Sequence, residues 1–183
     1  MQGRTHAPFH ARGLVLVEVL VAVGVLVVLA ALALPSFAAI SERLKLRTAA
    51  QALTSSLYAA RAEALKRGGR VALGRDEGAG CGAAKEDRAQ WGCGWVLFAD
   101  EDEDGTRGPS DELLQTWQPP PGIDVIQTSK RATLRLNAWG QFNGLGALSF
   151  VLLSRADAGA VSVICISSGG RLQSWAGVDR CPS

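Results

Sequence analysis

Histidine is nearly absent from this 183-residue chain, and its two copies, His6 and His10, both precede residue 14. Residues 14–183 therefore offer no imidazole for acid–base catalysis or for metal binding. The chain also lacks the patterns of a P-loop, a dinucleotide-binding loop, a serine nucleophile elbow and a zinc-protease helix. Its length is too small for a large multidomain enzyme. We therefore do not expect an enzyme.

A strong charge bias is missing as well, because 19 basic and 17 acidic residues leave a formal net charge of +2. Arg4 and Arg12 account for this whole excess, so the side chains of residues 14–183 balance. The balance argues against a histone-like polycation. A content of 48% hydrophobic and 20% charged residues argues against a disordered chain. The sequence shows no internal repeat and no low-complexity linker.

A long apolar run is present near the N-terminus. Residues 14–34 read LVLVEVLVAVGVLVVLAALAL, carry one charge, Glu18, and end at Pro35. At about 1.5 Å per residue this run spans about 31 Å, close to the hydrocarbon thickness of a bilayer. We therefore predict a membrane-spanning helix over 14–35. A cleaved secretory signal peptide and a plain single-pass anchor are the alternatives, but neither explains a carboxylate that costs several kcal/mol in lipid.

Residues 36–69 have a different pattern, in which apolar side chains recur at steps of four and three. Most of the other residues are good helix formers, and Gly68-Gly69 resembles a helix C-cap. We predict an amphipathic helix here, continuous with the apolar one, so that a single helix runs from Leu14 to Arg67. The predicted apolar stripe consists of Leu46, Ala50, Leu53, Leu57, Ala60 and Ala64.

Residues 70–183 show short β-type runs separated by Gly, Pro, Asp and Asn. The runs are RVALGR from Arg70, GWVLF from Gly94, ELLQTWQ from Glu112, IDVIQT from Ile123, ATLRL from Ala132, LSFVLL from Leu148, VSVICI from Val161 and RLQSWA from Arg171. No helical period of useful length follows Gly69. The predicted fold class is α+β: a long N-terminal helix whose amphipathic half packs on a mostly antiparallel, sandwich-like β head.

The N-terminus resembles that of type IV pilin-like proteins, which carry a class III signal peptide. The matching parts are the basic leader 1–13 ending in Gly13, an apolar first residue, Leu14, and Glu18 as the fifth residue after the cut. The resemblance implies cleavage between Gly13 and Leu14 by a prepilin peptidase and methylation of the new amine. It also implies that Glu18 pairs with the N-terminal amine of a neighbouring subunit. The usual first mature residue of the family is Phe, not Leu.

The body resembles the GspH/FimT family of minor pilins and type II secretion pseudopilins, through WGCGWVLFADEDEDG, the run from Val161 and SSGGRLQSW. The resemblance implies a low-abundance subunit at or near the tip of a type II secretion pseudopilus or a type IV pilus. The implied partners are other pilin subunits, the prepilin peptidase and an inner-membrane assembly platform. The implied location is the bacterial inner membrane, with one span and a periplasmic head, and then the filament.

Four cysteines, Cys81, Cys93, Cys165 and Cys181, lie in the part expected to be exported. Four cysteines allow three pairings. Nearness in sequence favours Cys81–Cys93 and Cys165–Cys181. A zinc site made of four thiolates is the alternative, but the chain contains no C-x-x-C pair, and export favours disulfides.

An acidic segment matches the start of a calcium-binding loop, with Asp100, Asp102 and Asp104 before Gly105. The twelfth place of such a loop is Asp111 rather than the preferred Glu. Because the segment lies between strands, we favour an acidic turn without metal and expect no cofactor. Calcium bound by these four residues stays the alternative.

Some FimT-like proteins bind DNA through a Gly-Arg-x-Arg segment near the C-terminus. This chain has Gly170-Arg171-Leu172-Gln173, so the resemblance carries over to Arg171 but the second Arg is missing. DNA is therefore a possible partner that we do not favour. A positively charged face would be needed to bind phosphates, with a marked salt dependence.

Overall fold

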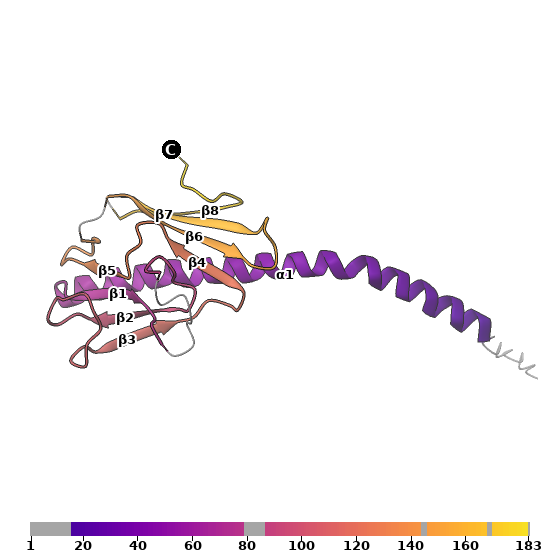
Figure 1. Cartoon of the computed structure of the whole chain (residues 1–183), viewed down its shortest axis with the longest axis horizontal. Coiled ribbons are helices and arrows are strands. Elements are labelled where there is room, and N and C mark those ends of the chain that lie inside the picture. The colour runs from indigo at the N-terminus through magenta and orange to yellow at the C-terminus, as the bar shows by residue number, and fades with distance from the viewer. Residues whose placement is uncertain (1–15, 79–86, 144–145, 168–169, 183) are drawn as a thin grey trace, which may run out of the picture. The chain divides into compact units, whose positions relative to one another are not determined.

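The structure is a computed structural model that describes residues 16–78, 87–143, 146–167 and 170–182, with the backbone alone for 32–36. Figure 1 shows a long helix, α1 (Leu16–Arg67), and strands that follow it. The strands are β1 (Val71–Arg75), β2 (Trp95–Ala99), β3 (Leu113–Trp117), β4 (Ile123–Gln127), β5 (Thr133–Leu136), β6 (Leu148–Ser154), β7 (Val161–Ile166) and β8 (Leu172–Ala176). Each predicted β run contains one of these strands.

The predicted apolar stripe of α1 is the face that the helix buries. Leu53, Leu57 and Ala60 are fully buried, and Ala49 joins them one turn earlier. The other members of the predicted stripe, Leu46, Ala50 and Ala64, are buried too. A stripe with this spacing covers one side of a helix, and the other side is exposed.

The C-terminus of α1 is capped as the Gly-Gly pair predicts. Gly68 and Gly69 have positive φ angles of 71° and 94°. The Gly69 N–H donates to the Ala64 carbonyl at 2.8 Å, the six-to-one bond of a Schellman motif. Glycine adopts these angles without the steric penalty of a Cβ. The chain therefore leaves the helix at Arg67 and turns directly into β1.

The strands form two antiparallel four-stranded sheets, ordered β3-β2-β1-β5 and β4-β6-β7-β8. In the second sheet, residues of β6 alternate between buried and half-buried positions, as expected for a sheet with one face on a core. β1 and β2 differ, because all their residues are buried. Both faces of the first sheet are therefore covered at its centre.

One hydrophobic core joins the buried face of α1 to both sheets. Leu73 and Trp95 enter it from the first sheet, and Phe150 and Ile164 enter it from the second. The ring of Trp91 packs edge-on against Phe150, with centroids 5.1 Å apart. A smaller cluster, Ala72, Val96 and Phe98, lies outside this core. This arrangement confirms the predicted α+β class, with the helix packed on antiparallel sheets.

The chain divides into two compact units, Met1–Ala39 and Ile40–Ser183. The second unit contains the C-terminal part of α1 together with all the strands described above. In the part of the chain that the structure describes, no helix reaches the length and apolarity of a membrane span. The span expected for residues 14–35 and the predicted boundaries at 13, 35 and 69 remain predictions.

Candidate functional site

The first part of α1 exposes apolar side chains over its whole circumference. Leu16, Val17 and Leu20 are each more than 60% exposed, and the pattern continues to Leu29. A helix that is apolar all round is stable only where lipid or other apolar helices surround it. This segment of α1 therefore requires an apolar environment, such as lipid or other helices, that the rest of the described chain does not provide.

Glu18 lies in the first turn of α1 and is exposed among these apolar neighbours. A carboxylate near a helix N-terminus interacts favourably with the helix dipole. A single acid in an apolar segment also needs a cationic partner once water is removed. The predicted cleavage position, Gly13 and Leu14, lies outside the described residues. The structure therefore describes Glu18 but not the N-terminal amine that cleavage would create.

The later part of α1 is fastened to the head by buried polar contacts as well as by its apolar stripe. The Trp95 indole N–H donates to the Ser56 hydroxyl at 2.8 Å, and both side chains are fully buried. Near the other end of this segment the Ser154 hydroxyl donates to Glu42 at 2.7 Å, and Lys45 pairs with the same carboxylate at 2.6 Å. The hydrogen bond from Lys45, and then that from Ser154, lowers the pKa of Glu42.

Two arginines of α1 extend this attachment toward the C-terminal end of the helix. Arg61 donates to the Gly170 carbonyl at 2.6 Å. Arg67 bonds to Glu63 on its own helix at 3.0 Å and to Glu112 at 2.9 Å. These two carboxylates, Glu63 first, raise the pKa of Arg67. The helix segment within Ile40–Ser183 is thus held at several points along its length, as a rigid spine requires.

The sequence interpretation missed these polar contacts. Ser56 has a recognisable signal, because it is a hydroxyl within the apolar stripe, directly before Leu57. A polar residue on a buried helix face must find a hydrogen-bond partner. The partner itself is far away in sequence, so the signal indicates a contact without naming Trp95.

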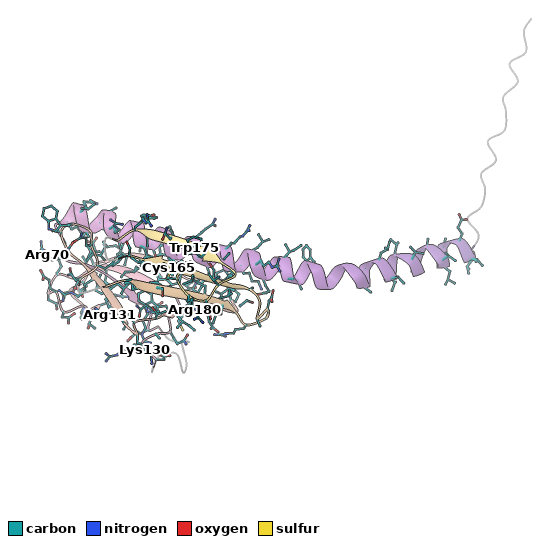
Figure 2. All side chains as sticks on the ribbon, turned by 90° about the horizontal axis from the view of Figure 1, so that it is seen from above. Arg70, Lys130, Arg131, Cys165, Trp175 and Arg180 are labelled. Atoms are coloured by element: carbon teal, nitrogen blue, oxygen red, sulfur yellow. A yellow bond between two sulfur atoms is a disulfide. The ribbon has the colours of Figure 1, made fainter. Side chains whose placement is uncertain are left out.

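One of the two predicted disulfides is present in the described residues. Cys165 on β7 is bonded to Cys181 beyond β8, with Cα atoms 5.9 Å apart (Figure 2). Cys93 is also disulfide-bonded. Its predicted partner, Cys81, lies outside the described residues. A four-thiolate zinc site is incompatible with the Cys165–Cys181 bond, because bonded sulfurs carry no thiolate.

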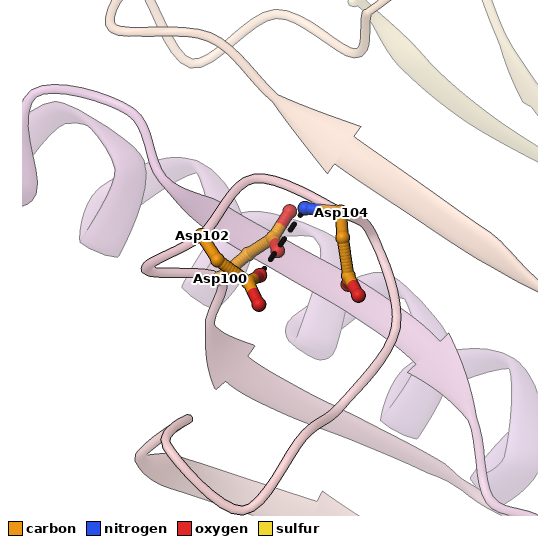
Figure 3. Close-up of side chains that lie close together, drawn as sticks. All are labelled: Asp100, Asp102 and Asp104. Atoms are coloured by element: carbon orange, nitrogen blue, oxygen red, sulfur yellow. Dashed lines mark hydrogen bonds between the residues drawn. The ribbon is translucent and has the colours of Figure 1, made fainter.

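The acidic loop after β2 brings three of the four proposed calcium ligands together. Carboxylate oxygens of Asp100, Asp102 and Asp104 all lie within 4.8 Å of one another (Figure 3). Asp111 is not part of this group. Its two carboxylate oxygens accept hydrogen bonds from the backbone N–H groups of Glu101, at 3.2 Å, and Gly108, at 2.7 Å. Asp111 therefore closes the loop as a turn residue.

Asp100 is already engaged by the protein. One of its oxygens accepts from the Gly105 N–H at 3.1 Å, and the other pairs with Arg135 at 3.1 Å. Its side chain is buried, and this burial raises its pKa, against the opposing effects of Gly105 and Arg135. The guanidinium of Arg135 supplies the positive charge that a calcium ion would bring. Arg135 also pairs with Glu103 at 3.6 Å, and Arg70 pairs with Glu101 at 3.2 Å, so the arrangement suits an acidic turn held by two arginines.

Arg171, the residue proposed to contact DNA, is exposed immediately before β8. Its backbone N–H donates to the Ser167 hydroxyl at 3.0 Å, which shapes the turn, and its guanidinium forms no ion pair with a described residue. DNA binding stays a prediction. A mobility shift at low salt that disappears in Arg171→Ala would support it, and the absence of any shift would exclude it.

Comparison with known proteins adds a family and a fold. Residues 49–170, more than half of the chain, match the family model described as type II transport protein GspH. The fold is similar to crystal structures of the type IV minor pilin FimU from Pseudomonas aeruginosa (strain PAO1). The form in space group P21 is 20% identical, with a TM-score of 0.55 over 73% of this chain and 90% of that one. The form in space group P65 is 19% identical, with a TM-score of 0.53 over 70% and 91%. No curated protein sequence matches the chain.

Proposed function

The chain belongs to the GspH family of minor pilin-like proteins, and on this premise we propose that it is a minor subunit of a type IV filament machine. The machine is a type II secretion pseudopilus or a type IV pilus, and the subunit takes its place at or near the tip. Members of this family and fold are structural subunits, and the chain has no histidine after residue 10. Its role is therefore assembly and not catalysis.

The observation that carries this proposal is the apolar surface of α1 from Leu16 to Leu29, interrupted by Glu18. In the proposed precursor this segment lies in the inner membrane, and in the filament it lies among the same segments of neighbouring subunits. Both surroundings are apolar, so both satisfy a helix that is apolar all round.

The proposed processing step explains the single acid. A prepilin peptidase cuts after Gly13, and the new amine on Leu14 is methylated. Glu18 then pairs with the amine of a neighbouring subunit in the filament core. Two charges taken out of water stabilise each other only when they are close and oriented, so this pair would set the register between subunits. The inner-membrane assembly platform would deliver the subunit to the growing filament.

The proposed location follows from the same reasoning. The precursor is a single-pass inner-membrane protein with Ile40–Ser183 in the periplasm. Disulfides form and persist in an oxidising compartment, and the bond between Cys165 and Cys181 supports an exported head.

Two substitutions separate processing from assembly. Gly13→Leu should leave the leader attached, so the precursor mass persists in the membrane. Glu18→Ala should be cut normally and yet be missing from purified filaments, because the core pair cannot form. Asp179→Asn, which removes an exposed acid of the head, is the matched control and should assemble normally. The measurements are intact mass and immunoblots of the membrane and filament fractions. Normal incorporation of both Gly13→Leu and Glu18→Ala would contradict the proposal.

A further inference from the structure

A groove of about 1010 Å³ runs along the head between α1 and the β7–β8 side of the second sheet. Small and apolar side chains line most of it, and it lies wholly within the unit Ile40–Ser183. On the helix its lining residues are Arg43, Leu46, Arg47, Ala50, Gln51, Thr54, Ser55 and Tyr58. From the sheet they are Gly159, Ala160, Val161, Ser162, Ser174, Ala176 and Gly177.

One wall of this groove is a free sheet edge. β8 is the last strand of its sheet and pairs with β7 alone. The Gly177 N–H donates to the Val161 carbonyl at 2.8 Å, and the Ser167 N–H donates to the Arg171 carbonyl at 3.0 Å. In an antiparallel pair such bonded positions recur at every second residue. The bonds between β7 and β8 therefore fall on odd-numbered residues.

The even-numbered residues of β8 consequently direct their backbone groups away from β7. These residues are Leu172, Ser174 and Ala176, and no further strand lies beside them in the described sheet. Ser174 and Ala176 also line the groove. An open row of N–H and C=O groups is a template for another extended chain.

The side chains around this edge leave room for such a chain. Ser174 and Ala176 are small and exposed, and they face the helix across the groove. Tyr58 on the helix lines the groove and is 53% exposed. An added strand would place every second side chain in the groove, against the apolar surface of Tyr58.

The charges of the groove select the partner. Arg43 and Arg47 are its only charged lining residues, both are exposed, and neither forms an ion pair with a described residue. Unpaired charges of one sign at the rim of an apolar surface favour a partner of opposite sign. The occupant should therefore be both extended and acidic.

We propose that an extended acidic segment of a partner subunit binds here as an added strand on β8, with its alternate side chains in the groove and its carboxylates at Arg43 and Arg47. That the occupant is another subunit rests on the proposed function. The free edge, the groove and the two arginines are features of the structure and do not depend on it. A helix would leave the outward N–H and C=O groups of Ser174 and Ala176 unpaired, because its own backbone groups are already bonded.

The proposal is tested with the full chain in mild detergent and a seven-residue peptide with blocked ends, in which every second position carries first two valines and then two glutamates, with serine between them. The same peptide with lysine for glutamate is the control. Amide hydrogen exchange at single-residue resolution should slow at Ser174 and Ala176 by at least about tenfold with the acidic peptide at millimolar concentration. The amides of Gln173 and Trp175, already bonded to β7, should change little.

Three variants sharpen the result. Arg43→Glu with Arg47→Glu should weaken the acidic peptide by at least about tenfold at low salt and strengthen the lysine peptide. Lys130→Glu makes the same kind of charge change at an exposed lysine outside the groove and should alter neither. Ser174→Pro removes an outward N–H that β7 does not use, so circular dichroism should stay unchanged while peptide binding is lost.

Equal binding of the two peptides, or no protection at Ser174 and Ala176, would overturn the proposal. Protection that grows with protein concentration in the absence of peptide would overturn it in favour of a second copy of the chain. None of these measurements needs a filament. Their failure would leave the proposed assembly role in place, and normal assembly of Glu18→Ala would leave the groove proposal in place.

Discussion

Replacing Ser56 by alanine removes the only hydroxyl that the buried Trp95 indole contacts in the described hydrogen-bond network. The Trp95 N–H donates to Ser56 at 2.8 Å, and Ser56 in turn donates to the Leu53 carbonyl at 2.8 Å. Both side chains have no exposed surface. No water can therefore reach the indole N–H without opening the contact between α1 and the first sheet.

The size of the effect follows from two opposing contributions. A buried donor without an acceptor costs about 1–3 kcal/mol. Alanine is a better helix former than serine by up to about 0.5 kcal/mol. We therefore expect Ser56→Ala to lower the free energy of unfolding by about 0.5–2.5 kcal/mol. With a urea m-value of about 2 kcal/mol/M, a loss of about 1.5 kcal/mol moves the midpoint by about 0.7 M.

The matched control is Ser55→Ala, because Ser55 is exposed and its hydroxyl bonds only to the Ala52 carbonyl of its own helix, at 2.8 Å. Its unfolding free energy should stay within about 0.5 kcal/mol of the parent. Urea unfolding in mild detergent, followed by tryptophan fluorescence, measures both variants. A double-mutant cycle with Trp95→Phe should show coupling between the two sites. Equal effects of Ser55→Ala and Ser56→Ala, or the absence of coupling, would refute the reasoning.

Three further predictions use the same unfolding assay. Gly94 has a φ of 113°, and an added Cβ would lie 2.6 Å from a backbone carbonyl oxygen. Gly94→Ala should therefore lower the free energy of unfolding by about 1–3 kcal/mol more than Gly177→Ala, whose Cβ would meet nothing within 4 Å. Equal losses in the two variants would contradict the predicted clash. Removing the disulfide by Cys165→Ser with Cys181→Ser should cost about 3 kcal/mol, because the two cysteines are 16 positions apart and the bond closes a loop of that size. An unchanged midpoint would show that this bond does not constrain the unfolded chain. The pKa of Glu42 lies below its ordinary 4.5, so on acidification the unfolded chain protonates this carboxylate before the folded chain does. Its contribution to stability is therefore present above pH 4.5 and lost as pH falls through the lowered pKa. Glu42→Gln should flatten the dependence of unfolding free energy on pH in this range, and an identical dependence would exclude the ion pair as its source.

Local pattern was sufficient for the secondary structure. The four-and-three spacing from Leu46 to Ala64 predicts the buried helix face, and the Gly68-Gly69 pair predicts where the helix ends. Both signals depend on residues within a few positions of one another, and both are confirmed. The short β runs are confirmed for the same reason, because strand residues alternate and turn residues interrupt them locally.

Strand pairing was not predictable in the same way. β5 pairs with β1, although β4 is its nearer neighbour in sequence. β4 instead pairs with β6 and forms one edge of the second sheet. Such choices depend on which buried faces meet around α1, and this requires the positions of all the elements at once.

The candidate site shows the same division. Glu18 is recognisable from sequence, because one acid in a long apolar run is costly wherever the run lies. The acidic loop is recognisable as well, but only the folded chain separates Asp111 from its neighbours and places Arg135 beside Asp100.

The amino-acid sequence by itself determined the helix, the strands, the family resemblance and the position of the one acid in the apolar segment. These follow from composition and short-range periodicity. The tertiary structure alone decided that Ser56 receives the indole of Trp95, that Arg135 lies beside Asp100 and that the outward edge of β8 faces Arg43 and Arg47 across a groove. Each of these joins segments far apart in the chain, and their meeting depends on how the apolar faces of helix and sheets are buried together.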